Sequence, residues 1–117
     1  MTSIFMNGEN RKINRFEIWI VSLDPTIGSE ISKSRPCLVI SPNEMNNNLK
    51  TILVAPLTHT IKQYPTRISV QLKNQNGEIA LDQIRAVDRL RFIQKIMVLD
   101  KVNSFVVCEK LKEIFEY

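Results

Sequence analysis

Hydrophobic and polar positions change pattern shortly after the start of the chain. Residues 1–14 are polar and aperiodic, which predicts a mobile N-terminal tail, and residues 15–117 are predicted to form one domain. Phe16 to Leu23 is rich in aromatic and β-branched residues, as is typical of a buried strand. Asp24-Pro25 ends this strand as a turn, and the polar residues 26–34 are predicted to form a loop.

Four further segments are predicted to be strands. The clearest is Arg67 to Leu72, in which hydrophobic and polar residues alternate. Asn76-Gly77 predicts a tight hairpin turn, because both residues tolerate positive φ, and the returning strand is predicted over residues 78–87. The other two strands are predicted over residues 36–41 and 51–57, separated by a polar turn at the three asparagines 46–48.

The last segment has a helical period. Asp100 is a good N-cap, and hydrophobic residues then recur at roughly helical spacing at Val102, Phe105, Val106, Leu111 and Phe115. Five short strands followed by one helix predict a mainly β fold, a small and strongly bent antiparallel barrel with a C-terminal α-helix over part of one open end. Because so small a barrel buries few residues, an apolar surface patch used for dimerisation is expected.

Composition narrows the location and the chemistry. No apolar run approaches the ~20 residues that cross a bilayer, and the first residues lack a secretory signal, so a cytoplasmic protein without membrane contact is expected. Cys37 and Cys108 are predicted to be small core residues; together with a single histidine they cannot supply four metal ligands, so no metal and no cofactor are expected. The net charge of +4 is compatible with a polyanionic partner, and equally with a solvated basic surface.

The densest polar cluster is the predicted loop that ends at Arg35-Pro36. Proline restricts the residue before it to extended conformations, so Arg35 is held at the entry of a strand, where its guanidinium suits a phosphate. Glu30 can orient that guanidinium. The alternative is an ordinary Arg–Glu pair that closes the loop, and these residues taken alone favour it.

Three ordered motifs add to this picture. The first is Ile18 to Thr26 with Gly28-Ser29-Glu30 and Ser34 to Ser41; the second is Val54-Ala55-Pro56-Leu57-Thr58; the third is Leu81 to Asp88 followed by Arg91. Together they resemble the MazF/PemK toxins over Arg15 to about Leu99. The resemblance implies an SH3-like, MazF/CcdB-like barrel that forms a homodimer, cleaves single-stranded RNA sequence-specifically without a metal, and is neutralised by the acidic C-terminal segment of a cognate antitoxin.

The resemblance also implies roles for individual residues. Arg35 and Thr58 fall at the catalytic pair, with Glu30 in support, and Asp82 falls where some relatives place a catalytic carboxylate. The chain departs from the family pattern at four positions, where relatives have Gly, His, Gln and Arg in place of Phe16, Ser29, Ile31 and Ala80. The departures at Ser29 and Ala80 disfavour a mechanism built on Asp82 and favour one built on Arg35 and Thr58.

The chemistry of RNA makes such a mechanism reasonable without a metal. Each phosphodiester has a neighbouring 2′-OH as internal nucleophile, and in-line attack gives a 2′,3′-cyclic phosphate and a 5′-OH end. Arg35 can stabilise the charge that grows on the phosphoryl oxygens, and Thr58 can donate a hydrogen bond to them. A guanidinium is protonated at neutral pH, so the base stays unassigned, with Glu30 as a candidate and His59 as a weaker one.

RNA-binding residues are expected in the loops around this pair. Tyr64 is a candidate platform for stacking a base, and the basic residues can follow the backbone, although each charge taken singly is more often only solvated. The full set of candidates is Ser29, Lys33, Asn43, His59, Tyr64, Arg67, Asp82, Gln83 and Arg85.

Two other functions stay open. A CcdB-like toxin would poison gyrase through the C-terminal helix, without nuclease activity, although the intact motifs around Arg35 and Thr58 favour the nuclease. A catalytically degenerate member would bind RNA or antitoxin without cutting, and the changes at Phe16, Ile31 and Ala80 are compatible with that.

Overall fold

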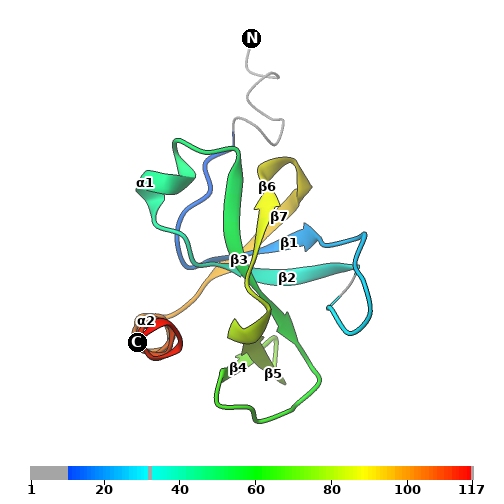
Figure 1. Ribbon diagram of the computed structural model, residues 1–117, viewed down its shortest axis with the longest axis vertical. Coiled ribbons are helices and arrows are strands. Elements are labelled where there is room, and N and C mark those ends of the chain that lie inside the picture. Colours follow the sequence, from blue (N-terminus) through cyan, green and yellow to red (C-terminus); the bar gives the residue numbers. More distant parts are fainter. Residues whose placement is uncertain (1–10, 32, 117) are drawn as a thin grey trace.

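The fold is a curled antiparallel sheet with one long helix (Figure 1), seen in a computed structural model that describes residues 11–31 and 33–116. The strands are β1 (Glu17–Ser22), β2 (Ser34–Val39), β3 (Thr51–Thr58), β4 (Arg67–Leu72), β5 (Gln75–Ala80), β6 (Arg85–Asp88) and β7 (Phe92–Val98). The helices are α1 (Asn43–Asn46) and α2 (Lys101–Phe115), with 3₁₀ turns η2 (Leu81–Gln83) and η3 (Arg89–Arg91). The predicted mainly β barrel with a C-terminal helix is confirmed.

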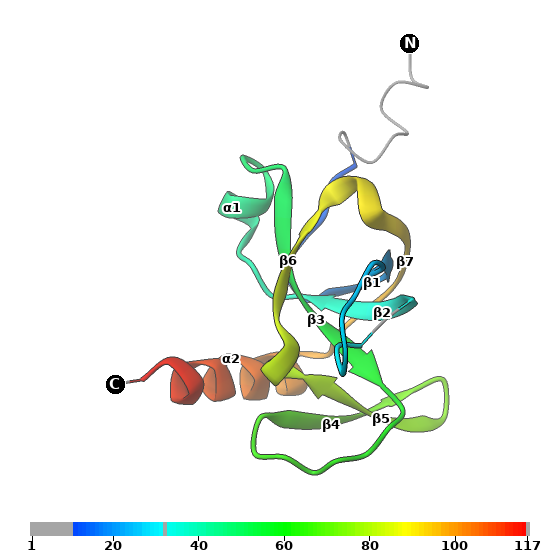
Figure 2. The same cartoon turned by 45° about the vertical axis from the view of Figure 1, so that its right-hand side comes forward.

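Strand β3 is the centre of the sheet. The strand order is β4-β5-β3-β2-β1-β7, and β6 pairs with β3 outside this path. One edge of β3 pairs with β6 over Thr51 to Val54 and then with β5 at Leu57 and Thr58, while β2 pairs along the other edge. The sheet therefore bends around β3, and the β4–β5 hairpin lies well away from β7 (Figure 2).

Both faces of the central strands are buried. Ile18 and Leu38 belong to a cluster that Val107 of α2 covers, while Trp19 and Cys37 belong to a second cluster on the opposite face. Trp19 packs edge to face on Phe92 with ring centroids 5.7 Å apart, which confirms its expected core position. Cys37 is fully buried, as predicted for a core residue, and burial raises the pKa of its thiol to about 12. Cys108, for which the same was predicted, is only partly buried.

Residues 11–14 pack on the barrel, in contrast to the expected mobile tail. Ile13 is fully buried in the second cluster, and Arg11 donates hydrogen bonds to the carbonyls of Phe92 and Ile93. The guanidinium of Arg11 also lies 5.3 Å from the centroid of the Trp19 ring. One apolar residue in a polar stretch has no periodicity, which is why the pattern gave no sign of this packing. The rest of the expected tail, residues 1–10, lies outside the described residues.

The predicted hairpin turn at Asn76-Gly77 is wrong by three residues. The last cross-strand pair before the turn is Leu72 with Gln75, so Lys73 and Asn74 form the turn, with φ of 51° and 66°. Gly77 lies within β5 instead. A Cβ there would stand 3.0 Å from the carbonyl oxygen of Thr58, so the glycine permits a close approach of two strands.

Two other parts of the chain differ from the prediction. The strand expected over residues 78–87 is interrupted by η2, and β7 was not predicted, because most of its side chains are exposed and show no alternation. Asn46 belongs to α1 and is buried, donating to the carbonyl of Ser41 at 2.9 Å. The predicted helix is confirmed, and the Asp100 carboxylate caps it by accepting the N–H of Asn103 at 3.1 Å. No helix in the described ranges is long and apolar enough to span a bilayer.

Candidate functional site

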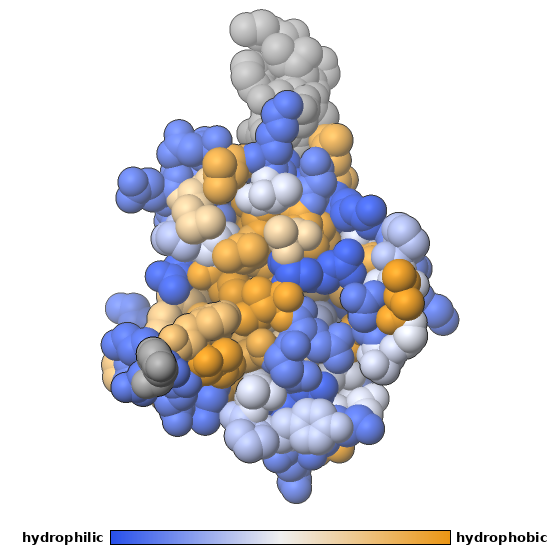
Figure 3. All heavy atoms as spheres, viewed as in Figure 1, coloured by the Kyte–Doolittle hydropathy of each residue, from blue (hydrophilic) through white to orange (hydrophobic). Residues whose placement is uncertain are grey.

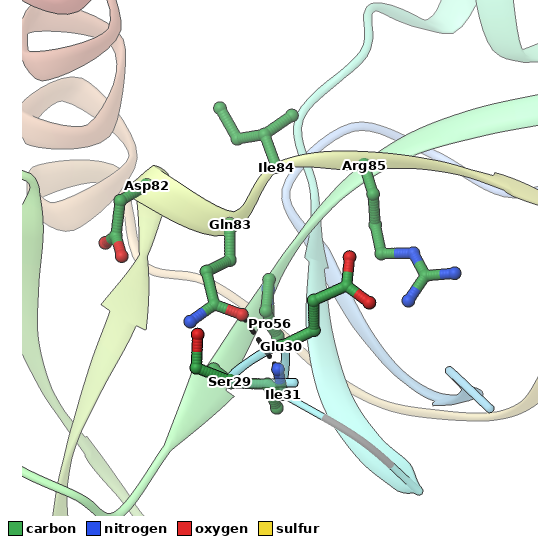
Figure 4. A pocket seen from close by; sticks show the side chains of 8 residues that line it. All are labelled: Ser29, Glu30, Ile31, Pro56, Asp82, Gln83, Ile84 and Arg85. Atoms are coloured by element: carbon green, nitrogen blue, oxygen red, sulfur yellow. Dashed lines mark hydrogen bonds between the residues drawn. The ribbon is translucent and has the colours of Figure 1, made fainter. Parts of the chain in front are cut away.

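A polar cleft lies between the β1–β2 loop, the end of β3 and η2. It consists of two adjoining pockets of about 400 and 240 Å³ that share Ser29, Glu30, Ile31 and Gln83. The larger pocket continues to Asp82 and Arg85 (Figure 4), and the smaller one continues to Arg35 and Thr58. The cleft therefore joins the sequence motif that ends at Arg35 to both of the other motifs.

Strand register brings Arg35 and Thr58 together. Strands β2 and β3 are paired as far as Cys37 and Pro56, and just beyond this last pair Arg35 and Thr58 line the same pockets. The hydroxyl oxygen of Thr58 accepts the N–H of Thr60 at 3.1 Å, so the hydroxyl hydrogen can be donated elsewhere. Both residues also line a third hollow, of about 120 Å³, with the ring of His59 and with Gly77. An arginine and a hydroxyl donor thus line the same two hollows.

Hydrogen bonds from backbone N–H groups to carboxylates of the same loop close the β1–β2 loop. The Glu30 carboxylate accepts the N–H of Ile27 at 2.6 Å, and the Asp24 carboxylate accepts the N–H of Lys33 at 2.9 Å. Gly28 has φ of 62°, in the left-handed region that suits glycine. The Glu30 side chain is therefore folded back onto its own loop, as a local brace.

Gln83 joins this loop to η2. Its side-chain oxygen accepts the N–H of Ile31 at 2.8 Å. An N–H group can donate only to the oxygen of an amide, so the orientation of the amide is settled and its nitrogen is presented as a donor. Figure 4 shows that nitrogen turned away from Ile31, on the side of Ser29 and Asp82. Arg85 lines the same pocket while it donates to the Leu23 carbonyl at 3.1 Å.

Asp82 and Arg67 bind each other. Arg67 donates to both carboxylate oxygens of Asp82, at 2.7 and 3.2 Å, and the Thr66 hydroxyl donates to one of them at 3.1 Å. Desolvation raises the pKa of Asp82, but these donors outweigh it and hold the pKa below its ordinary value. Arg67 lies opposite Ala80 in the β4–β5 register, so its guanidinium reaches Asp82 from the neighbouring strand.

Two of the predicted RNA-binding residues are placed differently from the prediction. The Arg67 side chain lines the smaller pocket, but it is only 5% exposed and is bound to two carboxylates, so it is less open to a nucleic-acid backbone than the prediction expected. Asn43 begins α1, a helix that Figure 1 shows apart from the β1–β2 loop, and its side chain accepts the N–H of Arg15 at 2.7 Å. The sequence pattern suggested it only because it lies in a polar stretch.

The other predicted residues lie around the cleft. His59 contacts the Asn76 carbonyl through Nδ1 at 3.2 Å, and the Tyr64 ring is half exposed beneath the Arg67 guanidinium, 5.1 Å from it. Lys33 is exposed at the end of the β1–β2 loop. Lys62, one of the basic residues expected to follow the RNA backbone, lines the smaller pocket together with Thr60. The prediction missed Glu78, which is buried. Among the described residues, no group of three or more His, Cys, Asp or Glu side chains is placed to hold a metal ion.

The fold and the cleft define a class: a small bent antiparallel barrel whose central strand presents an arginine–hydroxyl pair in a cleft lined by hydrogen-bond donors. Residues 14–115 match the family described as PemK-like, MazF-like toxin of type II toxin–antitoxin system. The chain therefore belongs to this family of toxins.

Individual relatives agree with this assignment. The chain is 34% identical over 106 residues to Endoribonuclease EndoA of Bacillus subtilis (strain 168), an alignment that covers 86% of this chain and 91% of EndoA. MazF from Deinococcus radiodurans has a similar fold, with a TM-score of 0.79 at 22% identity over 92% of this chain and 99% of that one. A mycobacterial endoribonuclease in complex with its cognate antitoxin has a TM-score of 0.73 at 16% identity over 86% of this chain and 92% of that one.

Proposed function

We propose that this chain is a sequence-specific endoribonuclease that cleaves single-stranded RNA without a metal and acts as the toxin of a toxin–antitoxin pair in the cytoplasm. The observation that carries the proposal is the meeting of Arg35 and Thr58 on adjacent strands, inside a cleft shared by all three family motifs. Family membership and the 34% identity to a protein named as an endoribonuclease support it.

The chemistry is that of an internal nucleophile. The 2′-OH attacks the adjacent phosphorus in line, the bond to the 5′-oxygen breaks, and the products are a 2′,3′-cyclic phosphate and a 5′-OH end. The Arg35 guanidinium stabilises the charge on the phosphoryl oxygens. The Thr58 hydroxyl, whose oxygen already accepts the Thr60 N–H, donates its hydrogen to the same oxygens.

Glu30 supports this pair in two ways. Through its bond to the Ile27 N–H it shapes the loop that faces Arg35, and its carboxylate is the candidate acceptor for the 2′-OH proton. A carboxylate is a modest base, but proximity to the reacting hydroxyl raises its effectiveness. His59, on the other side of Thr58, is the weaker candidate.

The bases next to the cleaved bond are read in the larger pocket and beside it. Gln83 presents an amide N–H₂ there, so it recognises an acceptor on a base edge, such as a carbonyl oxygen. Ser29 and Asp82 line the same pocket, Arg85 adds positive charge, and Tyr64 offers a flat ring at the far side of Arg67. Lys33 on the exposed loop follows the RNA backbone.

Two protein partners are part of the proposal. A homodimer is supported by exposed apolar side chains on α2 and β7, among them Val102, Phe105, Ile93 and Val98. Apolar atoms also gather along α2 and across the middle of the face in Figure 3. The second partner is an antitoxin with an acidic segment, for which the cleft cations Arg35, Lys62 and Arg85 offer complementary charge.

One experiment tests activity, chemistry and metal independence together. Pure protein is incubated with a long single-stranded RNA of mixed sequence in EDTA, and the 5′-OH ends are sequenced. We expect cuts at one short motif, and a loss of about 100- to 1000-fold in R35A. Matched variant K101A removes a positive charge from the exposed start of α2 and should cut normally. Loss of cutting on chelation, or full activity in R35A, would contradict the proposal, and gyrase inhibition without nuclease activity would favour a CcdB-like toxin.

A further inference from the structure

A buried carboxylate lies directly behind the cleft. Glu78 of β5 pairs with Thr58 of β3 and with Ser69 of β4. Its side chain therefore leaves the sheet on the face opposite the core residues Ile79 and Val70. A strand residue on that face would ordinarily meet solvent. Glu78 is nevertheless only 1% exposed, because the β3–β4 loop (residues 59–66) folds over it.

Three donors converge on this carboxylate. It accepts the backbone N–H of Lys62 at 3.1 Å, the backbone N–H of Gln63 at 3.0 Å and the Arg67 guanidinium at 3.1 Å. Desolvation raises the pKa of Glu78, but the three donors outweigh it and keep the pKa below its ordinary value, so the group is charged at neutral pH. The β3–β4 loop is thus held from inside by a charged side chain of β5.

Arg67 extends the same network to the other side of the cleft. Its guanidinium bridges Glu78 and Asp82 and lies over the Tyr64 ring. Tyr64 belongs to the β3–β4 loop, while Asp82 belongs to η2, next to Gln83. One arginine therefore ties the loop to the turn that lines the larger pocket.

The loop needs this support to keep its shape. Gln63 has φ of 57°, a left-handed conformation that is unfavourable for a residue other than glycine and persists only where its surroundings hold it. The two backbone amides that Glu78 binds, those of Lys62 and Gln63, lie immediately before this point in the chain. On the outer side of the same loop, Thr60 and Lys62 line the pocket that contains Arg35 and Thr58.

An ion pair at this depth is not explained by stability alone. Replacing a buried pair by apolar residues of similar volume is often neutral or stabilising, because desolvation costs about as much as the attraction returns. What apolar residues cannot do is bind two consecutive backbone amides and so set the path of the loop. The position of the network, directly beneath a loop that lines the cleft, matches that use.

We propose that Glu78 and Arg67 are positioning residues for RNA binding, a proposal that rests on the function proposed above. They hold the β3–β4 loop so that Lys62 and Thr60 face the RNA backbone next to the phosphate at Arg35 and Thr58. Glu78 does not line the cleft, and Arg67, which does line the smaller pocket, is bound there to Glu78 and Asp82. Their loss weakens binding of the substrate while the chemical step, which uses Arg35 and Thr58, continues.

The test compares two identical chemical changes, E78Q and E113Q. Glu113 lies on α2, 65% exposed and paired only with Lys110 among the ion pairs of the described residues. Cleavage of a labelled single-stranded oligonucleotide containing the mapped motif is followed with each protein. We expect KM to rise about tenfold in E78Q with kcat within about twofold of the wild type, and E113Q to match the wild type in both.

Hydrogen exchange gives an independent readout of positioning. The amides of Lys62 and Gln63 should exchange at least tenfold faster in E78Q than in E113Q. The exchange rates of the β3 amides, which lie outside this loop, should all change by one common factor that reports the global stability of the variant. If E78Q does not fold, R67K takes its place, because an ammonium keeps the charge but cannot bridge two carboxylates as a guanidinium does. In R67K the rise in KM should again exceed the change in kcat.

The two proposals fail in different ways. A wild-type chain that cuts no RNA would contradict the nuclease function, and the exchange rates would still report whether Glu78 positions the loop. A folded E78Q with unchanged exchange at Lys62 and Gln63, or with unchanged KM, would overturn the positioning role. A loss in kcat at unchanged KM would also overturn it, because it would place Glu78 in the chemical step.

Discussion

The two loops that border the cleft are built in opposite ways. The β1–β2 loop is exposed and closes on itself through Glu30 and Asp24, with one further bond from Gln83 to Ile31. The β3–β4 loop is held from beneath by the buried Glu78 and by Arg67. The first loop can adapt to a bound chain with little loss, because the two bonds within it are local and exposed to solvent. The path of the second loop is set before any ligand binds.

This difference suggests a division of work. The β1–β2 loop forms one wall of the cleft, the adaptable wall, which suits the reading of different base edges. The β3–β4 loop (residues 59–66) forms the other, the preset wall, which suits the fixed geometry of a phosphate. Thr58 stands where the preset wall begins, at the end of β3, directly opposite Glu78 across the strand pair. Substitutions in the two walls should therefore have distinguishable effects, and a substitution at Thr58, where the two walls meet, should have the largest effect.

The largest effect is expected from Thr58→Val. The substitution keeps the shape and removes the hydroxyl, so the phosphoryl oxygens lose one donor in the transition state. We expect kcat to fall about 100-fold or more at nearly unchanged KM, measured by single-turnover cleavage of a labelled oligonucleotide. Thr51→Val, at the exposed start of the same strand, is the matched control and should cut normally. Equal activity in both variants would remove Thr58 from the mechanism.

A stability measurement compares the carboxylates of the two walls directly. Removing the charge of Glu78 leaves the Arg67 guanidinium partly unpaired in a buried site, so Glu78→Gln should lower the free energy of unfolding by about 3 kcal/mol at pH 7. Glu30→Gln removes an exposed carboxylate and should leave the urea midpoint close to that of the wild type. Equal midpoints for the two variants would mean that the walls do not differ in the way described.

Acid should expose the same difference. The pKa of Glu78 and that of Asp82 are both lower in the folded protein than their ordinary values of 4.5 and 3.8. Such groups stabilise the fold at pH above their unfolded values, and that contribution is lost as the pH falls through the folded values. Urea midpoints should therefore decline from about pH 5 downward, and less steeply in E78Q than in the wild type. A wild-type midpoint that does not decline between pH 5 and 3 would contradict the charged state of this network.

Sequence patterns predicted some strands, the long helix and part of the cleft, but not the remaining strands. Alternation placed β4 at its observed bounds, and Asp100 marked the start of α2, because both signals are local in the chain. The resemblance to a family likewise indicated Arg35, Thr58 and Gln83, which the fold brings into one cleft. Most of β7 is exposed and gave no pattern, and the Asn-Gly pair that suggested a turn lies inside β5.

The network behind the β3–β4 loop depends on tertiary structure. The sequence places Glu78 in an apolar run, Gly-Glu-Ile-Ala-Leu, where alternation assigns it to the solvent side of the sheet. Only the path of residues 59–66 across that side buries it, and no local pattern reports such a path. The same holds for Arg67, because its two carboxylate partners come from β5 and η2 and no local pattern reports that they meet.

A smaller effect, on specificity, is expected from Gln83→Glu. A carboxylate oxygen can still accept the Ile31 N–H, so the β1–β2 loop keeps its anchor, but the donor that faced the pocket becomes an acceptor. We expect cleavage at the wild-type motif to fall about tenfold, with a shift at one motif position towards bases that present an amino group. Sequencing of the 5′-OH ends from both proteins checks this. An unchanged motif would show that Gln83 anchors the loop without reading a base.

Gly28 and Gly77 give the finest comparison, because Gly28 lies in the β1–β2 loop and Gly77 lies in β5 next to Thr58. A Cβ at Gly28 would meet nothing within 4 Å, so Gly28→Ala should cost about 1 kcal/mol of stability, from its φ of 62°, and leave kcat unchanged. A Cβ at Gly77 would lie 3.0 Å from the Thr58 carbonyl oxygen and 3.7 Å from Nδ1 of His59. Backbone cannot yield as a flexible side chain does, so Gly77→Ala should move Thr58 by a few tenths of an ångström and lower kcat about threefold to tenfold. Thermal melts and single-turnover rates of the two variants check both expectations. A kcat loss in Gly28→Ala alone would mean that the geometry at Thr58 depends on the adaptable wall and not on the preset one.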